Sequence, residues 1–191
     1  MIEVYNCEQY SDEWWALRAG RFTASQANKL LTPTGKLSTQ YKAELGRLIA
    51  ELMGLQEPDR NEFSTEWMDR GSEMEEEAFA WLCVDQDVDL EPVGIITDGS
   101  EIIGASSDAV IKTYDFTDRG GTERFTYVPV EIKVPKPSTH IQWLLDGGVP
   151  KQHLAQVQFQ MAVCDSEVGY FMSYNPDLEP LVIRLEANEY T

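Results

Sequence analysis

The first third of the chain spaces its apolar residues with the period of helices. Residues 11–18 begin with a serine and two acidic residues, the usual composition of a helix start, and predict one helix. Thr23 or Ser25 can cap a second, short helix, and residues 38–53 predict a third. Residues 32–36 contain a proline and a glycine, which indicate a turn or loop before the third helix.

A longer helix is predicted from about residue 64 to residue 83. At about 100° per residue its apolar side chains share one face, and these are Trp67, Gly71, Met74, Ala78, Phe79 and Leu82. Glu75 falls inside this apolar face, whereas the neighbouring acidic residues point away from it. Because a buried carboxylate needs a hydrogen-bond partner or a cation, we expect Glu75 to have a specific role.

After residue 85 the pattern changes to the alternation of strands. Strands are predicted at residues 91–97, 101–104, 108–112, 127–134, 167–174 and 181–185, and a helix at residues 151–163. Asp98-Gly99 is a hairpin turn signal. Residues 113–124 form a polar connection, and we expect residues 113–127 to be a surface hairpin. This order of elements predicts one α/β domain over residues 1–191, with a mixed central β-sheet flanked by α-helices.

The net charge of −18 changes the picture of the partners, because a surface this acidic repels polyanions. Composition alone therefore argues against a general nucleic-acid binder, and any action on nucleic acid needs a localised site. The three cysteines are far apart and lack the spacing of a zinc site, so we expect reduced thiols. No apolar run approaches the length of a membrane helix. We therefore expect a cytoplasmic protein without a membrane partner.

Glu131 and Lys133 stand out in the strand predicted at residues 127–134. Alternation places both charges on one side of the strand, while Val130 and Ile132 face the other. Placing two charges on an otherwise apolar strand costs desolvation energy, so the pair needs a reason. Lys133 is the one lysine in the chain with an acid two residues before it. The pair is either a site or an ordinary ion pair on an edge strand, and the spacing alone leaves both readings open.

Asp108 shifts the balance towards a site. It begins a predicted strand directly after a turn, where its carboxylate can meet Glu131 from a neighbouring strand. Two adjacent carboxylates repel each other unless a cation compensates, and a hard divalent ion such as Mg²⁺ is the natural one for oxygen ligands. Lys133 can then stabilise the charge that develops on a phosphate.

Several segments, in order, resemble a known family. Asp108 followed by Glu131-Ile-Lys133 resembles the PD-(D/E)xK core of restriction-endonuclease-like nucleases. The segment RAGRFTAS at residues 18–25 is similar to a signature of the bacteriophage lambda exonuclease and YqaJ-type viral recombinase family, and GSEME at residues 71–75 resembles its helix with an early glutamate. Asp98 and the segment LAQVQ at residues 154–158 match further motifs of that family. Ser107 departs from the motif, which has proline before the aspartate.

The resemblance implies a restriction-endonuclease-like fold and a role for each matched residue. Asp108, Glu131 and the Ile132 carbonyl would bind metal, with Glu75 near a second ion, and Lys133 would be the catalytic lysine. The ions would be Mg²⁺, with Mn²⁺ as a substitute. The residues matching the family's pocket for a terminal 5′-phosphate are Arg18, Ser25, Ser106 and Gln156, and Asp98 would support the site. Arg is well suited to bidentate phosphate binding.

The resemblance further implies a 5′→3′ exonuclease on linear double-stranded DNA, which releases mononucleotides and leaves a 3′ single strand for recombination. A ring-shaped homotrimer and a single-strand annealing protein are the partners it implies. Two other readings remain: an endonuclease with the same core, and a non-catalytic recombination scaffold. A phosphate pocket argues against the first, because an internal cutter has no use for it. The presence of Asp108, Glu131 and Lys133 argues against the second.

Overall fold

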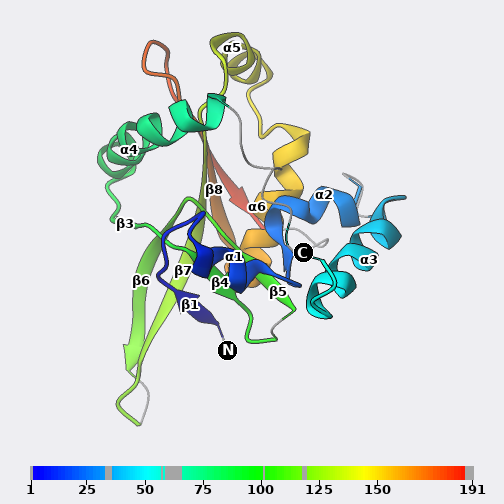
Figure 1. Ribbon diagram of the computed structural model, residues 1–191. Helices are drawn as coiled ribbons and strands as arrows, with labels where there is room; N and C mark the ends of the chain where they lie inside the picture. The colour runs from blue at the N-terminus through cyan, green and yellow to red at the C-terminus, as the bar shows by residue number, and fades with distance from the viewer. Residues whose placement is uncertain are drawn as a thin grey trace.

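A computed structural model describes residues 2–32, 36–56, 58, 66–100, 102–117 and 120–187, with side chains omitted for residues 66–73 (Figure 1). The helices are α1 (Asp12–Arg18), the 3₁₀ helix η1 (Ala24–Gln26), α2 (Ala27–Leu30), α3 (Tyr41–Leu52), α4 (Glu66–Gln86), α5 (Pro137–Asp146) and α6 (Lys151–Val163). The strands are β1 (Glu3–Tyr5), β2 (Phe22–Thr23), β3 (Leu90–Glu91), β4 (Ile95–Thr97), β5 (Ile103–Ala105), β6 (Ala109–Thr117), β7 (Glu123–Lys133), β8 (Val168–Ser173) and β9 (Leu181–Glu186). The chain is therefore mixed α/β, as predicted.

The larger sheet has the order β3-β6-β7-β8-β9. β7 pairs antiparallel with β6 and parallel with β8, so the sheet is mixed. The crossover from β7 to the parallel β8 passes through α5 and α6, as parallel strands require a long connection. Since β7 lies in the interior of this sheet, the alternative of an edge-strand ion pair for Glu131 and Lys133 is wrong.

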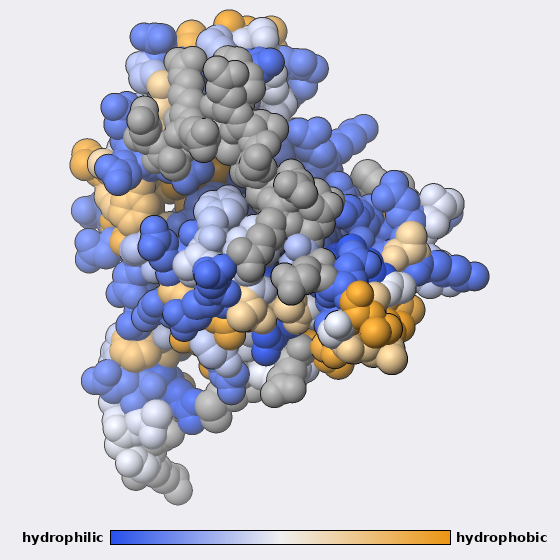
Figure 2. Space-filling view, in the orientation of Figure 1, coloured by the Kyte–Doolittle hydropathy of each residue, from blue (hydrophilic) through white to orange (hydrophobic). Residues whose placement is uncertain are grey.

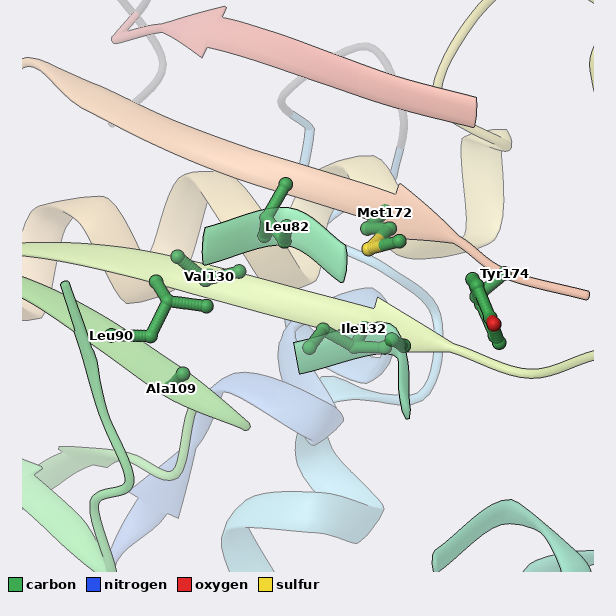
Figure 3. Close-up of a cluster of buried hydrophobic side chains, with 8 residues drawn as sticks. Leu82, Leu90, Ala109, Val130, Ile132, Met172 and Tyr174 are labelled. Atoms are coloured by element: carbon green, nitrogen blue, oxygen red, sulfur yellow. The ribbon is translucent and has the colours of Figure 1, made fainter. Parts of the chain in front are cut away.

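Two helices cover opposite faces of the larger sheet. Ala78 and Leu82 of α4 are 0% and 1% exposed and pack against the apolar face of β7 and β8, where Val130, Ile132 and Met172 lie (Figure 3). On the other face, Val157 and Met161 of α6 pack against Phe171 and Leu185. The alternation of β7 therefore directs Glu131 and Lys133 towards α6, away from the core that α4 covers.

A second, four-stranded sheet has the order β1-β4-β5-β2, where one continuous central sheet was predicted. The strand predicted at residues 91–97 is in fact two short strands, β3 and β4, in different sheets. Pro92 lies at the break, and its lack of an N–H ends the ladder of β3. The hairpin turn at Asp98-Gly99 is confirmed, since β4 and β5 pair antiparallel around it and Gly99 has a φ of +82°.

The connection between β6 and β7 is a hairpin, as predicted. Both strands continue into the polar segment 113–124, where β6 ends at Thr117 and β7 begins at Glu123. Cross-strand contacts explain why the strands extend: the rings of Tyr114 and Phe125 lie 5.9 Å apart, and Lys112 Nζ lies 4.4 Å from the centre of the Phe125 ring. The two strands form a hairpin that projects from the body of the molecule (Figure 1).

Helix α5 was not predicted. Its first residue is Pro137, and Gly147 ends it in a left-handed conformation with a φ of +65°. The prolines at positions 135 and 137 indicate a strand end. Proline is also favoured in the first turn of a helix, so the same residues are compatible with a helix start. His140 of α5 is fully buried, with its ring nitrogens 2.7 Å from Ser173 Oγ and 2.9 Å from the Glu179 carbonyl. These contacts tie α5 to the end of β8.

No helix among the described ranges combines the length and the apolar character that crossing a membrane requires.

Candidate active site

Asp108, Glu131 and Lys133 lie together, as the sequence predicts. Lys133 Nζ is 2.5 Å from Glu131 Oε1 and 3.6 Å from Asp108 Oδ2. The same ammonium donates a hydrogen bond to the Ile132 carbonyl at 3.0 Å. Asp108 reaches this point from the residue before β6, where its Oδ2 accepts a hydrogen bond from Ile132 N at 2.6 Å. The carbonyl and the two carboxylates predicted as metal ligands therefore surround one ammonium.

Burial and charge together set the protonation of this cluster. Burial raises the pKa of Asp108 to about 6; Lys133 works against the rise and Glu131 adds to it. Burial also opposes the charged form of Lys133, but the carboxylates of Asp108 and Glu131 outweigh it and raise the pKa of the lysine. Lys133 therefore carries a positive charge throughout the neutral range.

The oxygens around Lys133 fit a divalent cation. The Lys133 ammonium is itself a cation, and two carboxylate oxygens and a carbonyl oxygen surround it. The same oxygens are therefore suited to another cation. Hard oxygen donors of this kind suit Mg²⁺, which takes the rest of its coordination from water and substrate phosphate. Among the described residues, no three Asp, Glu, His or Cys side chains converge on one point. The protein donors are thus two carboxylates and a carbonyl.

Glu75 differs from its prediction. It lies three and seven residues before Ala78 and Leu82, on the face of α4 that packs on the sheet, yet its own side chain is exposed and not buried. Trp67 and Gly71, which were predicted to share this face, fall in residues 66–73, of which the structure describes the backbone alone. Partial burial and then the charge of Asp108 raise the pKa of Glu75, while Lys133 lowers it. The charge of Glu75 is therefore felt by the cluster, and its role near a second ion stays a prediction.

Two glutamines of α6 hold the Glu131 carboxylate. Gln156 Nε2 donates to Oε1 and Gln160 Nε2 donates to Oε2, each at 2.5 Å. In the sequence, His153, Gln156 and Gln160 share one polar face of this helix, which leaves a solvated face as the alternative to a site. Gln160 is fully buried, so that alternative is wrong for this part of α6. Gln156 was predicted to hold a terminal phosphate, but its amide instead lies on Glu131. The role of Gln160 was missed, although its spacing of four from Gln156 was a usable signal.

Three of the residues predicted to bind a terminal phosphate lie together around the Arg18 guanidinium. Arg18 donates to Ser106 Oγ at 3.2 Å and to Ser25 Oγ at 3.1 Å, and Thr23 Oγ1 accepts a third hydrogen bond at 3.0 Å. The guanidinium carbon lies 4.2 Å from the centre of the Trp14 ring, and Trp14 Nε1 donates to Ser106 Oγ at 3.0 Å. A planar cation with hydroxyls around it is suited to a phosphate oxygen. We call Arg18, Ser25 and Ser106 the phosphate set.

A contact from α3 supports the phosphate set and was not predicted. Gly20 N, two residues after Arg18, donates to Glu51 Oε2 at 3.0 Å. Gly20 has a φ of +71°, and an added Cβ would lie 2.5 Å from Leu52. Glu51 in turn pairs with Arg47, which also binds Glu44. In the sequence these acids look like an ordinary polar helix face, so nothing distinguished them.

Asp98, predicted to support the site, acts in the β4–β5 turn. Its Oδ1 accepts a hydrogen bond from Ser100 N at 2.9 Å, and the hydrogen bonds from Ser100 lower its pKa. This is the local role of an aspartate that stabilises a turn. A contribution to the site would be indirect, through the position of β5 and the residues that follow it.

Comparison with known proteins places this geometry in context. A family model of the YqaJ-like viral recombinase domain matches residues 13–167. The fold is similar to that of an alkaline exonuclease (LHK-Exo) from Laribacter hongkongensis, with a TM-score of 0.73 and 24% identity over 94% of this chain and 84% of that one. The structure of LHK-Exo in complex with dAMP gives a TM-score of 0.71 and 26% identity over the same shares. A phage-related exonuclease from Haemophilus somnus 129PT gives 0.59 and 12% identity, over 91% of this chain and 87% of that one. No curated protein matches the chain.

His153, on the same face of α6 as Gln156, gives a testable pH dependence. Its ring stacks on Phe171 at 5.7 Å and meets Trp143 edge-on at 5.5 Å. Burial, and then the charge of Lys133, lower the pKa of His153 to about 4. The folded protein therefore keeps this residue neutral at pH values where the unfolded chain protonates it. Stability linked to His153 is complete above pH ~6.5 and is lost as the pH falls towards 4.

We predict that His153→Gln reduces the acid sensitivity of folding. Between pH 7 and pH 5 the free energy of unfolding of the unmodified protein should fall by about 1–2 kcal/mol more than that of the variant. Urea denaturation at the two pH values measures this difference. Ala162→Gln, at an exposed position near the end of α6, should keep the unmodified pH dependence. Equal slopes for His153→Gln and the unmodified protein would show that His153 is not held neutral.

Proposed function

The chain belongs to the family of YqaJ-like viral recombinase domains and is a deoxyribonuclease, and we propose that it is a Mg²⁺-dependent 5′→3′ exonuclease. In this proposal it digests one strand of linear double-stranded DNA from a 5′-phosphorylated end and releases mononucleotides. The 3′ single strand that remains is then available for recombination by an annealing protein.

The observation that carries the proposal is the short distance in sequence between two sites. We call Asp108, Glu131 and Lys133 the acidic cluster. Ser106 belongs to the phosphate set and Asp108 to the acidic cluster, and the fully buried Ser107 joins them. Two residues of extended chain span about 7 Å, which is on the scale of one nucleotide. A DNA end held by its phosphate at Arg18 would therefore present its first internal phosphodiester to Asp108, Glu131 and Lys133. An endonuclease has no need of this pairing.

Each residue of the site has a defined task in this scheme. Asp108, Glu131 and the Ile132 carbonyl would hold Mg²⁺, which when bound supplies a Lewis acid for the phosphoryl oxygens and for the attacking water. Lys133 keeps its positive charge and stabilises the charge that develops on the scissile phosphate. The amides of Gln156 and Gln160 fix both oxygens of Glu131, so its carboxylate does not reorient. Arg18 positions the substrate by its terminal phosphate.

The proposal predicts a preference for 5′-phosphorylated ends that depends on Arg18. With Mg²⁺, end-labelled linear duplex carrying a 5′-phosphate should be digested about 10–100 times more efficiently than duplex carrying a 5′-hydroxyl, the range expected for charge-assisted hydrogen bonds. Arg18→Gln should remove this preference by lowering kcat/KM on the phosphorylated duplex alone. Arg184→Gln, with 51% of its side chain exposed, is the matched control and should retain the preference.

Two further observations make this experiment decisive. Lys133→Ala should lose cleavage while still binding the phosphorylated end, because its charge acts on the scissile phosphate and not on the terminal one. Cleavage of covalently closed circles, or equal digestion of both kinds of end by the unmodified protein, would refute the exonuclease proposal. Unchanged cleavage by Lys133→Ala would refute the assignment of the catalytic residues.

We also propose that three copies assemble into a ring around the DNA. The net charge of −18 disfavours loose binding to DNA, so a ring would hold the substrate by topology and not by nonspecific affinity. One exposed apolar stripe supports self-association: Leu45, Ile49 and Leu52 of α3 are 50%, 46% and 64% exposed at helical spacing. Apolar side chains gather on the molecular surface near α3 (Figure 2).

The ring predicts a solution mass three times that of the chain by analytical ultracentrifugation. Ile49→Glu should lower the mass, because it places a charge in the apolar stripe. Ala43→Glu, at an exposed position of α3 outside the stripe, should leave the mass unchanged. A monomeric unmodified protein would contradict the ring and would leave the chemistry of the site to the preceding experiment.

A further inference from the structure

Tyr10 has an unusual backbone conformation close to the site. Its φ is +66°, in the left-handed region that a bulky side chain rarely adopts. Ser11 N donates to the Glu8 carbonyl at 3.2 Å, which closes a turn with Tyr10 at its third position, where glycine is the usual residue for a positive φ. The other described non-glycine residues with positive φ are Asp87 and Asp165. Both are aspartates directly after a helix, where this conformation is common, so Tyr10 alone needs an explanation.

Specific hydrogen bonds hold this turn against the site. Gln9 Nε2 donates to the Val93 carbonyl and to the Ser107 carbonyl, both at 2.9 Å. Ser11 Oγ donates to the Glu8 carbonyl at 2.6 Å and accepts from Trp14 N as the cap of α1. Gln9 thus fixes the turn to the residue between Ser106 of the phosphate set and Asp108 of the acidic cluster. The strain at Tyr10 is maintained by contacts that also position its side chain.

The Tyr10 side chain lies beside the phosphate set. Its ring is 5.0 Å from the ring of Trp14, which contacts both Arg18 and Ser106. Its backbone belongs to the turn that Gln9 fixes to Ser107, the residue before Asp108. Partial burial, and then the charges of Asp108 and Glu75, raise the pKa of Tyr10. The residue is nevertheless 54% exposed. An accessible aromatic ring beside the phosphate set, in a turn held against the segment that leads to Asp108, is placed where the first nucleotide of a substrate would lie.

We propose that Tyr10 determines how the terminal nucleotide is held, by stacking its ring on the base or sugar of that nucleotide while the terminal phosphate is at Arg18. This inference rests on the proposed exonuclease function and adds a recognition element to it. Stacking on an aromatic side chain is tolerant of base identity, because every base offers a flat face. Tyr10 would therefore favour an ordered first nucleotide over an abasic one without selecting a sequence. Trp14 packs beside the Tyr10 ring and also contacts Arg18, so the position of the ring is linked to that of the guanidinium.

The test is a cycle of protein and substrate changes in the full chain. The substrates are 5′-phosphorylated linear duplexes whose first nucleotide is either normal or an abasic tetrahydrofuran analogue, and kcat/KM is measured for release of that nucleotide. Removing the base should lower kcat/KM of the unmodified protein by roughly 5-fold to 100-fold, the range for one stacked base. Tyr10→Gly should show a similar loss on the normal duplex and no further loss on the abasic one. Tyr10→Phe should behave like the unmodified protein.

Measurements of thermal stability distinguish stacking of Tyr10 on the substrate from a purely structural role of this residue. Glycine suits a φ of +66° better than tyrosine, so Tyr10→Gly should raise Tm by about 2–4 °C while lowering kcat/KM. Tyr114→Ala, at a tyrosine of the β6–β7 hairpin with 53% exposure, is the control and should keep the base dependence. A second readout is the fluorescence of 2-aminopurine as the first base, which should be quenched on binding to Lys133→Ala and not to Lys133→Ala/Tyr10→Gly.

Three outcomes would overturn the inference. The first is equal base dependence in Tyr10→Gly and the unmodified protein. The second is a fall in Tm with equal losses on both substrates. The third is a loss in Tyr10→Phe as large as in Tyr10→Gly, which would assign the effect to the hydroxyl. If the unmodified protein ignores the 5′-phosphate or cuts closed circles, the proposed function itself fails, and this result is distinct from the three above.

Discussion

The buried carboxylate of Glu131 is the constraint on which the rest of the structure depends. It is 1% exposed and lies in an interior strand of the larger sheet, where a charge without partners would be very costly. Lys133 neutralises it from the same strand, and Gln156 and Gln160 reach it from α6. Helix α6 must therefore cross this face of the sheet in one register. The packing of Val157 and Met161 on Phe171 provides that register, so the core and the site determine each other.

A second constraint joins the chemistry to the choice of substrate. The segment from Ser106 to Asp108 belongs to both halves of the site, and Gln9 binds it from the turn before α1. Trp14 contacts Ser106 and Arg18, while Glu51 of α3 binds Gly20 in the turn after α1. The N-terminal helices are therefore not peripheral additions to the sheet. They place the Arg18 guanidinium at a fixed separation from the acidic cluster, which in the proposed function would suit a phosphodiester-cleaving centre to a DNA end.

Sequence reasoning reached the local features and missed those that depend on tertiary contacts. The alternation of residues 127–134 and the period of residues 151–163 predicted β7 and α6, and the ordered motifs predicted that Arg18, Ser25 and Ser106 meet. Helix α5 was not predicted, because proline ends a strand but is also favoured at the first position of a helix, and Pro137 is compatible with either. The split at Pro92 into two sheets depends on pairing partners far along the chain. The exposure of Glu75 and the left-handed conformation of Tyr10 also depend on such contacts, so no local pattern revealed them.

We propose that Asp108, Glu131 and the Ile132 carbonyl bind a divalent cation through the oxygens that surround the Lys133 ammonium. Anomalous scattering from crystals grown with Mn²⁺, a substitute for Mg²⁺, tests it most directly. We expect a manganese peak within ligand distance of these three groups, with the Lys133 ammonium moved away from Glu131 Oε1. A peak only at surface acids, or none with Mn²⁺ in excess, would show that these groups do not hold the cation.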